Sequence, residues 1–216
     1  MKQYTPPSPY KKDGKIYDRV TTVLASIAKP ALYYYYARMA FEATHDLLDK
    51  TFEDVWSEVN RRQNTTKDRG SDVHDILEKY FSNNPYVIKE ENGYHRAVKL
   101  FIEEEAKNFE ASFLERTIWL DELEVAGRCD FYGTYKGKSA VVDFKTGLRA
   151  YPEYAIQLSA YKSALVKEGV AKNDTKLYNV VFMKDGRYQI VEQMDCVEVF
   201  HAVHIVYKFL KGYENK

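Results

Sequence analysis

The stretch Gly127-Arg-Cys-Asp-Phe, followed by Val141-Val-Asp-Phe-Lys-Thr-Gly, holds the pattern that decides the fold of this chain. Each segment is apolar around a single aspartate, Asp130 or Asp143, and Lys145 stands two positions after the second one. Because side chains two positions apart in a strand point to the same side, Asp143 and Lys145 are expected to share one face of a strand. Burying charged groups beside apolar ones costs free energy, so the arrangement predicts a site that binds a metal ion and acts on phosphate.

The chemistry expected of such a site follows from its residue types. Two aspartates supply the oxygen ligands that Mg²⁺ or Mn²⁺ prefers. The cation polarises a phosphoryl oxygen and lowers the pKa of a bound water, while a lysine can orient that water and offset negative charge in the transition state. An exposed Asp-x-Lys pair in an ordinary hairpin is the alternative interpretation, and three further features weigh against it.

The first two features lie on predicted helices. His74 falls early on an amphipathic helix, one turn after Gly70, and its imidazole could complete a site made by two aspartates. Gly70 would let this helix approach another backbone closely. Gln157 and Tyr161 are four residues apart on the helix that follows Lys145, so they share a face and could hold a DNA phosphate or support the lysine.

The third feature is an acidic residue on the strand that precedes the Gly127 segment. A pleated neighbour could bring the Glu115 carboxylate to the edge of the site. Glu122 and Glu124 are rivals, but the Asp-Glu pair that begins at Asp121 is typical of an exposed hairpin end, which favours Glu115.

Composition bounds the class of protein. The chain has 216 residues, of which 45% are hydrophobic and 30% are charged, as expected for one domain, or for one core with a substantial helical addition. Its 32 basic and 32 acidic residues cancel, whereas phosphate binding usually leaves a basic footprint. A nucleic-acid partner therefore requires charges that are sorted by face. Of the 19 tyrosines, most are expected to pack, and some could stack on bases.

Cysteine usage and hydropathy bear on the compartment. Cys129 and Cys196 have no Cys-x-x-Cys partner, which argues against a zinc or iron–sulfur site and suits a reducing compartment. No apolar run reaches the roughly 18 residues of a membrane span, and the first residues resemble neither a signal segment nor an Arg-rich leader. We expect no membrane partner and a location in the cytoplasm of a bacterial or phage-infected cell; a mitochondrial location would require that a leader has been removed.

Periodicity and turn residues predict a helical N-terminal half followed by a mixed α/β core. After a loose terminus over residues 1–16 and a short helix or strand over 17–27, helices are expected over 31–48, 52–62, 66–81 and 91–108. Strands over 111–119, 126–135 and 139–145, a helix over 152–167, a hairpin over 177–193 and a helix over 195–213 complete the chain. The order predicts one domain over 1–216, with a helical part over 17–110 and a mixed central sheet flanked by helices over 111–214.

Four motifs taken together resemble those of one enzyme family. The motifs are Gly70-x-x-x-His74, Gly127-x-x-Asp130, Asp143-x-Lys145 and Gln157-x-x-x-Tyr161. Their order and spacing are similar to those of the PD-(D/E)XK nucleases of the RecB/Cas4 type. The N-terminal Tyr17-x-x-Val-Thr-Thr-Val-Leu resembles phage-type and mitochondrial genome maintenance exonucleases, and the likeness covers residues 17–213. Cas4-type members carry a four-cysteine iron–sulfur cluster that this chain cannot hold, so the resemblance is to the cluster-free kinds.

This resemblance implies a restriction-endonuclease-like α/β core and a role for each matching residue. The ligands of Mg²⁺ or Mn²⁺ would be His74, Asp130, Asp143 and the carbonyl of Phe144. The catalytic residues would be Asp130, Asp143 and Lys145, with Glu115 as an accessory acid. The residues expected to contact DNA are Gln157, Tyr161, Arg69, Arg128, Thr146 and Arg149, with Lys162 as a further candidate to grip phosphate.

The function that the resemblance implies is a metal-dependent deoxyribonuclease. It would act as an exonuclease on single-stranded or free-ended DNA, in repair, recombination or replication. Its partners would be DNA and a recombination or replication protein. A structure-specific endonuclease or resolvase on the same core, and a non-catalytic DNA-binding domain, are the alternatives.

Overall fold

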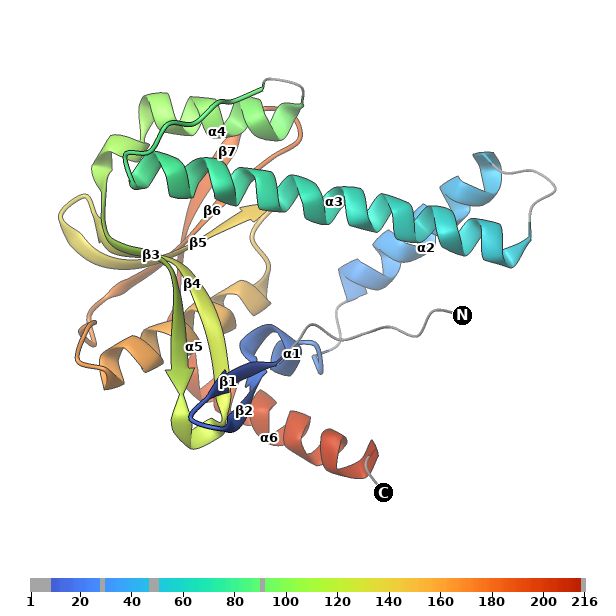
Figure 1. Ribbon diagram of the computed structural model, residues 1–216. Helices are drawn as coiled ribbons and strands as arrows, with labels where there is room; N and C mark the ends of the chain where they lie inside the picture. Colours follow the sequence, from blue (N-terminus) through green and yellow to red (C-terminus); the bar gives the residue numbers. More distant parts are fainter. Residues whose placement is uncertain (1–8, 28–29, 47–50, 90–91, 215–216) are drawn as a thin grey trace.

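One twisted sheet separates two groups of helices, as Figure 1 shows. The computed structural model describes residues 9–27, 30–46, 51–89 and 92–214, with the backbone alone for 30–32, 46, 63–69 and 214. The helices are α1 (Val20–Leu24), α2 (Pro30–Asp46), α3 (Phe52–Phe81), α4 (Gly93–Glu104), α5 (Pro152–Lys167) and α6 (Val197–Glu214), with 3₁₀ turns at Ala106–Asn108 and Asp121–Leu123. The strands are β1 (Tyr10–Lys12), β2 (Lys15–Arg19), β3 (Phe109–Leu120), β4 (Val125–Tyr135), β5 (Lys138–Thr146), β6 (Lys176–Phe182) and β7 (Tyr188–Gln193).

The sheet is mixed. Its strand order is β1-β2-β4-β5-β6-β7, and β3 pairs with β4 outside this path. The pairs β2–β4 and β5–β6 are parallel, and the other pairs are antiparallel. Parallel neighbours need a crossover, and α5 supplies it between β5 and β6. The expectation of a mixed central sheet flanked by helices is therefore confirmed.

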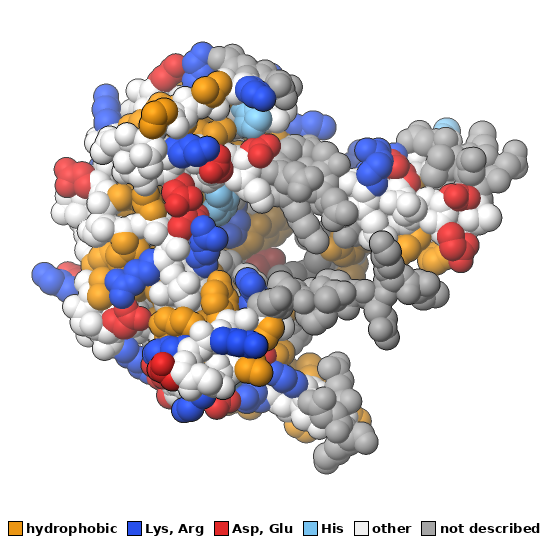
Figure 2. Space-filling model, viewed as in Figure 1, with side chains coloured by type: hydrophobic (Ala, Val, Ile, Leu, Met, Phe, Trp, Pro, Cys, Tyr) orange, Lys and Arg blue, Asp and Glu red, His pale blue; other side chains and the backbone are white. Residues whose placement is uncertain are grey.

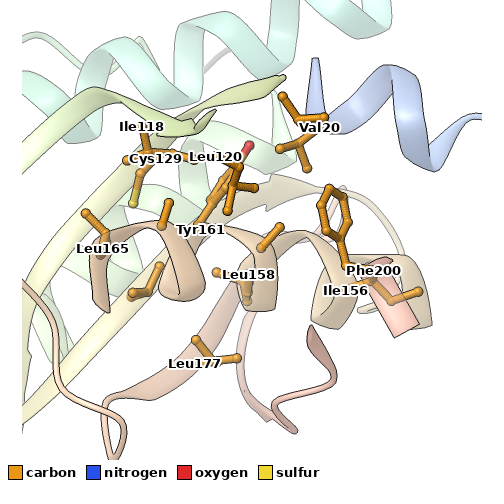
Figure 3. Close-up of a cluster of buried hydrophobic side chains, with 14 of the residues drawn as sticks. Val20, Ile118, Leu120, Cys129, Ile156, Leu158, Tyr161, Leu165, Leu177 and Phe200 are labelled. Carbon is orange, nitrogen blue, oxygen red and sulfur yellow. The ribbon is translucent and has the colours of Figure 1, made fainter. Parts of the chain in front are cut away.

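Each face of the sheet has its own apolar cluster. On the first face, Leu158, Tyr161 and Leu165 of α5 pack against Ile118 and Cys129 of the strands (Figure 3). Because α5 lies directly beneath the strands, the polar side chains on its first turns are carried towards the carboxyl end of β5.

The second face is covered by α3 and α4. Val73 and Leu77 of α3 and Phe101 of α4 are fully buried there, against Phe131 and Phe144 of the sheet. Burial of each such side chain contributes about 1.5–3 kcal/mol. This packing fixes the C-terminal half of α3 across the strands, and with it the residues of the predicted His74 motif.

The other half of α3 leaves the body of the molecule together with α2 (Figure 1). A capping box starts α3: the Thr51 hydroxyl accepts from the Asp54 amide at 3.3 Å, and the Asp54 carboxylate accepts from the Thr51 amide at 2.9 Å. A small cluster of Met39, Ala43 and Val59 joins the two helices. Of the helical part expected over residues 17–110, α2 and the first half of α3 form this projecting helix pair, whereas the second half of α3 and α4 pack on the sheet.

Two of the sequence expectations are wrong. Residues 10–16 are not loose, because β1 and β2 form a hairpin whose turn residues Asp13 and Gly14 have positive φ values of 50° and 77°. Asp-Gly is a favoured pair for such a turn, and the prolines nearby masked it in the sequence. The helices expected over 52–62 and 66–81 are one helix, α3. Residues 63–65 include two weak helix formers, Asn64 and Thr65, but no Gly or Pro, and extending an existing helix through them costs at most about 0.7 kcal/mol per residue.

The segment over residues 17–27, for which helix and strand were both open, contains the end of β2 and then α1. Across the part of the chain that the structure describes, no helix combines the length and the apolar character needed to cross a membrane.

Candidate active site

The site lies where β4 and β5 separate. Their pairing ends at Phe131 and Val142, although β5 continues beside β6 as far as Thr146. Just beyond the last β4–β5 pair, the amide of Phe144 donates to Asp130 Oδ2 at 2.9 Å. The aspartate carboxylate therefore takes the place of a strand-to-strand hydrogen bond, which holds a charged group in the gap between two central strands.

His74 reaches this gap from α3. Its Nε2 donates to the carbonyl oxygen of Phe144 at 2.8 Å, and its Nδ1 lies 3.4 Å from Glu115 Oε1 and 3.6 Å from Asp130 Oδ2. A Cβ atom added to Gly70, one turn earlier, would meet Thr146 Oγ1 at 3.7 Å. The helix thus passes close to the end of β5 at Gly70.

Glu115 enters the site through an unusual backbone conformation. It lies between Leu114 and Arg116, which pair with Phe131 and Cys129, so it is opposite Asp130. Its φ is +49°, in the left-handed region, where a non-glycine residue costs about 1–3 kcal/mol. Its carboxylate is paired with Arg128.

These side chains form a candidate cation site. Among the described residues, His74, Glu115 and Asp130 each offer a ligand atom, and these atoms lie within 4.8 Å of one another. The carbonyl of Phe144 contacts His74 at the same place. The structure thus brings together three of the four predicted ligands, and it adds Glu115 to them.

Asp143, the fourth predicted ligand, is held by a separate set of donors. Its side chain is 1% exposed, and Lys145 Nζ donates to Oδ1 at 2.6 Å. Gln157 Nε2 donates to the same oxygen at 3.1 Å, and Asn179 Nδ2 donates to Oδ2 at 2.9 Å. Both oxygens of Asp143 are therefore occupied by donors of the protein itself.

Burial and charge shift several pKa values in the site. Burial raises the pKa of Asp130, and the negative charge of Asp143 raises it further. Burial alone would lower the pKa of His74, but the hydrogen bond with Glu115 and the charge of Asp130 outweigh it and raise the pKa to about 9. The pKa of Lys145 is also raised, because the charges of Asp143 and Asp130 outweigh its burial. Lys145 is accordingly an ammonium ion at neutral pH.

Gln157 and Tyr161 stand behind Asp143 rather than at the surface. They are 7% and 3% exposed, and Gln157 Nε2 also donates to the Tyr161 hydroxyl at 2.8 Å. Figure 3 shows Tyr161 between α5 and the strands that carry Leu120 and Cys129. In the structure Gln157 supports the Asp143 carboxylate and Tyr161 accepts from Gln157, while their predicted contact with DNA stays a prediction.

The close fit between Gly127 and Tyr161 leads to a prediction. A Cβ atom at Gly127 would lie 2.5 Å from Tyr161 Cε1. We expect Gly127→Ala to destabilise the protein by about 1–3 kcal/mol, as overpacking does in a filled core, and urea denaturation measures this. The control is Gly212→Ala on α6, where nothing lies within 4 Å of the added atom. Equal stability of the two variants would show that Tyr161 yields easily.

The other residues predicted to contact DNA have different surroundings in the structure. Arg128 is bound to Glu115, although its side chain is 56% exposed, and Arg149 lies over the ring of Tyr151 at 5.3 Å. Thr146 is half-buried beside Gly70, and the side chain of Arg69 lies outside the described residues.

Lys162 is a correction to the predicted phosphate contacts. It is 7% exposed, and its Nζ donates to the Asn173 carbonyl at 2.6 Å and lies 2.8 Å from Asp195 Oδ2. These two partners give Lys162 a structural role, because it joins α5 to the segments that carry Asn173 and Asp195.

Sequence reasoning missed Asn179. Its signal was present, because it is an amide in the middle of the otherwise apolar run over residues 177–182. A polar residue at a buried position of a central strand needs a partner, and the partner here is Asp143.

Comparisons with known proteins find distant likenesses. No protein-family model matches the sequence, and no curated protein matches it. The solved structure of SSO0001 has a TM-score of 0.41 and 16% identity, covering 93% of this chain and 78% of that chain. A structure from Eubacterium rectale described as a "putative exonuclease" has a TM-score of 0.45 and 12% identity, covering 83% of each chain. Neither likeness is strong enough to assign an activity, so function has to be inferred from the mixed α/β fold and its histidine–carboxylate cluster beside a buried lysine.

Proposed function

We propose that the protein is a metal-dependent deoxyribonuclease with a restriction-endonuclease-like core of the PD-(D/E)XK type. One observation carries the proposal: the cluster of His74, Glu115 and Asp130 contacts the backbone of Phe144, the residue between Asp143 and Lys145, whose side chains form a part-buried ion pair. The two groups meet just beyond the last β4–β5 pair, Phe131 with Val142, where the two strands part. A cation site and a fixed ammonium side by side are the parts that phosphodiester hydrolysis requires.

The donor set fits Mn²⁺ or Mg²⁺. Two carboxylates and a backbone carbonyl are hard oxygen donors, and an imidazole is accepted by Mn²⁺ more readily than by Mg²⁺. His74, Glu115, Asp130 and the Phe144 carbonyl would hold the ion. When bound, the cation would polarise a phosphoryl oxygen and activate the attacking water.

Three side chains of the site would orient the attacking water and stabilise the developing charge. Lys145, 23% exposed at its side chain, can orient the attacking water and offset the charge that develops on the phosphoryl oxygens. Asp143 fixes the ammonium, and Gln157 fixes Asp143 in turn. Hydrolysis by direct attack of water needs positioning and charge stabilisation and no covalent intermediate.

The projecting helix pair supports a single-stranded substrate. Figure 2 shows a hollow between the body and this pair. Tyr33, Tyr34 and Trp56 of the pair are exposed to 64%, 71% and 50%. Exposed aromatic rings can stack on unpaired bases, for about 1–3 kcal/mol per base. We therefore favour DNA with single-stranded or free ends, as met in repair, recombination or replication, over a structure-specific endonuclease. A non-catalytic domain is disfavoured, because it would have no need of the buried Lys145 ion pair.

A comparison of DNA topologies tests this function. One end-labelled single strand, the same strand closed into a circle, and its duplex are incubated with Mg²⁺, with Mn²⁺, or with EDTA. We expect the linear strand to be degraded with either metal ion, the circle to persist, and EDTA to stop the reaction. Cutting of the circle as fast as the linear strand would favour the endonuclease, and persistence of every substrate would end the nuclease proposal.

A further inference from the structure

Asn179 is a polar residue in an apolar place. It lies on β6, between β5 and β7, and it is 0% exposed. Its neighbours Tyr178 and Val180 belong to the apolar cluster under α3 and α4. An amide buried at such a position costs free energy that a leucine or valine would not. A specific interaction has to explain its presence.

That interaction is with Asp143, its partner in the register of the parallel β5–β6 pair. The Asn179 Nδ2 group donates to Asp143 Oδ2 at 2.9 Å and lies 3.4 Å from the Asp143 carbonyl oxygen. Its own Oδ1 is buried and has no hydrogen-bond partner within the described part of the chain. Turning the amide over would set its oxygen against the carboxylate, so the orientation of Asn179 is dictated by Asp143.

The two oxygens of Asp143 are thereby made unequal. Asn179 occupies Oδ2, while Lys145 and Gln157 share Oδ1. With Oδ2 held from β6, the carboxylate cannot rotate, and Lys145 has one place in which to bind. Without Asn179, the carboxylate could turn and carry the ammonium to other positions.

We propose that Asn179 is a positioning residue that locks the Asp143 carboxylate, and through it Lys145, for phosphodiester hydrolysis. The inference rests on the proposed nuclease function. Because Asn179 is 0% exposed, it does not touch DNA. Its loss should therefore lower kcat and leave KM for DNA unchanged.

The first experiment measures kcat and KM on a linear single strand. Asn179→Leu, which removes the donor at similar volume, is expected to lower kcat by about 10- to 100-fold, as loss of a supporting hydrogen bond does at metal sites. Asn179→Thr keeps a hydroxyl donor and is expected to fall between this variant and the wild type. Tyr178→Phe, one residue away on the other face of β6, is the control and should keep kcat. Wild-type kcat in Asn179→Leu, or an equal loss in Tyr178→Phe, would overturn the proposal.

The second experiment does not depend on nuclease activity. Thermal unfolding in EDTA is measured for Asn179→Leu in the wild-type chain and in an Asp143→Ala chain. With Asp143 present, the substitution leaves Oδ2 unpaired, and the midpoint should fall. With Asp143 absent, it removes two unpaired polar atoms, and the midpoint should rise. An equal shift in both chains would show that Asn179 does not act through Asp143, whereas a sign reversal in a protein that cuts no DNA would reject the function and keep the coupling.

Discussion

Lys145→Met is expected to lower kcat on linear single-stranded DNA by about 100- to 1,000-fold, the range found when one preorganised donor to a transition state is removed. Methionine keeps an apolar stem beside the ring of Tyr154, which Lys145 Nζ faces at 5.4 Å. It removes the ammonium, and Asp143 Oδ1 then keeps Gln157 as its donor. We expect KM to change little, because the ammonium is held by Asp143 before DNA arrives.

The matched control is Lys176→Met, on the neighbouring strand β6. Lys176 also pairs with an acidic residue, at 2.7 Å from Glu192, but its side chain is 45% exposed. Exposed pairs of this kind contribute about 0–1 kcal/mol to stability, so activity and folding should both persist. If Lys145→Met retained more than about a tenth of the wild-type kcat, a loss much smaller than a preorganised donor contributes, Lys145 would not stabilise the transition state.

Much of the fold was predictable because its elements carry local signals. α5 begins at Pro152, and β7 follows the turn at Asp185 and Gly186, so the helix and the hairpin could both be located from local residues. The hairpin of β1 and β2 has an equally local signal in its turn residues Asp13 and Gly14, but a loose terminus was predicted there instead. The continuity of α3 was beyond local reasoning, because it depends on the cooperativity of a long helix that is anchored at both ends.

Apart from Asn179, the residues of the site could be predicted from the sequence. Which of these residues contact one another could not. The spacing of Asp143 and Lys145 fixed their common face, and the two do form an ion pair. The separation of Asp143 from the cluster of His74, Glu115 and Asp130 depends on donors brought from α5 and β6. Such contacts follow from strand register across a crossover, which a linear pattern does not contain. Asn179 was missed although the sequence shows an amide inside an apolar strand segment, because its partner could not be named before the register of β5 and β6 was known.

Asp130→Asn is expected to stabilise the protein in EDTA while abolishing its response to Mn²⁺. The asparagine carbonyl oxygen can still accept from the Phe144 amide, so the hydrogen bond that spans the strands is kept. The charge is lost, and in the wild type that charge is buried beside Asp143, which raises the pKa of Asp130. Because the folded-state pKa lies above the unfolded one, ionisation of Asp130 reduces stability at pH 8. Removing this cost should raise the unfolding midpoint by about 2–4 °C for each kcal/mol.

The pH dependence of this gain has a definite sign. As the pH falls below the folded-state pKa of Asp130, which burial raises to about 7, the folded carboxylate takes up a proton and its penalty shrinks steadily towards the ordinary carboxyl pKa of 3.8. His74, with a pKa of about 9, becomes positively charged over the upper part of the same pH range. Its positive charge favours the ionised form of Asp130, which also reduces the penalty. The difference in unfolding midpoint between Asp130→Asn and the wild type should therefore be widest near pH 9 and should narrow as the pH falls to 5. Thermal unfolding in EDTA across this range measures it.

Mn²⁺ should raise the unfolding midpoint of the wild type more than that of Asp130→Asn, which reverses the advantage of the variant in EDTA. A ligand that binds the folded state alone stabilises it by about 2.7 kcal/mol at 100 times its Kd, so Mn²⁺ should raise the wild-type midpoint by several degrees. Asp130→Asn lacks a charged ligand and should show little or no rise. Asp75→Asn is the control: Asp75 follows His74 on α3 but is exposed and pairs with Lys79 at 2.6 Å. It should respond to Mn²⁺ as the wild type does. An Asp130→Asn protein that is less stable in EDTA, yet rises with Mn²⁺ like the wild type, would show that Asp130 joins the strands and holds no cation.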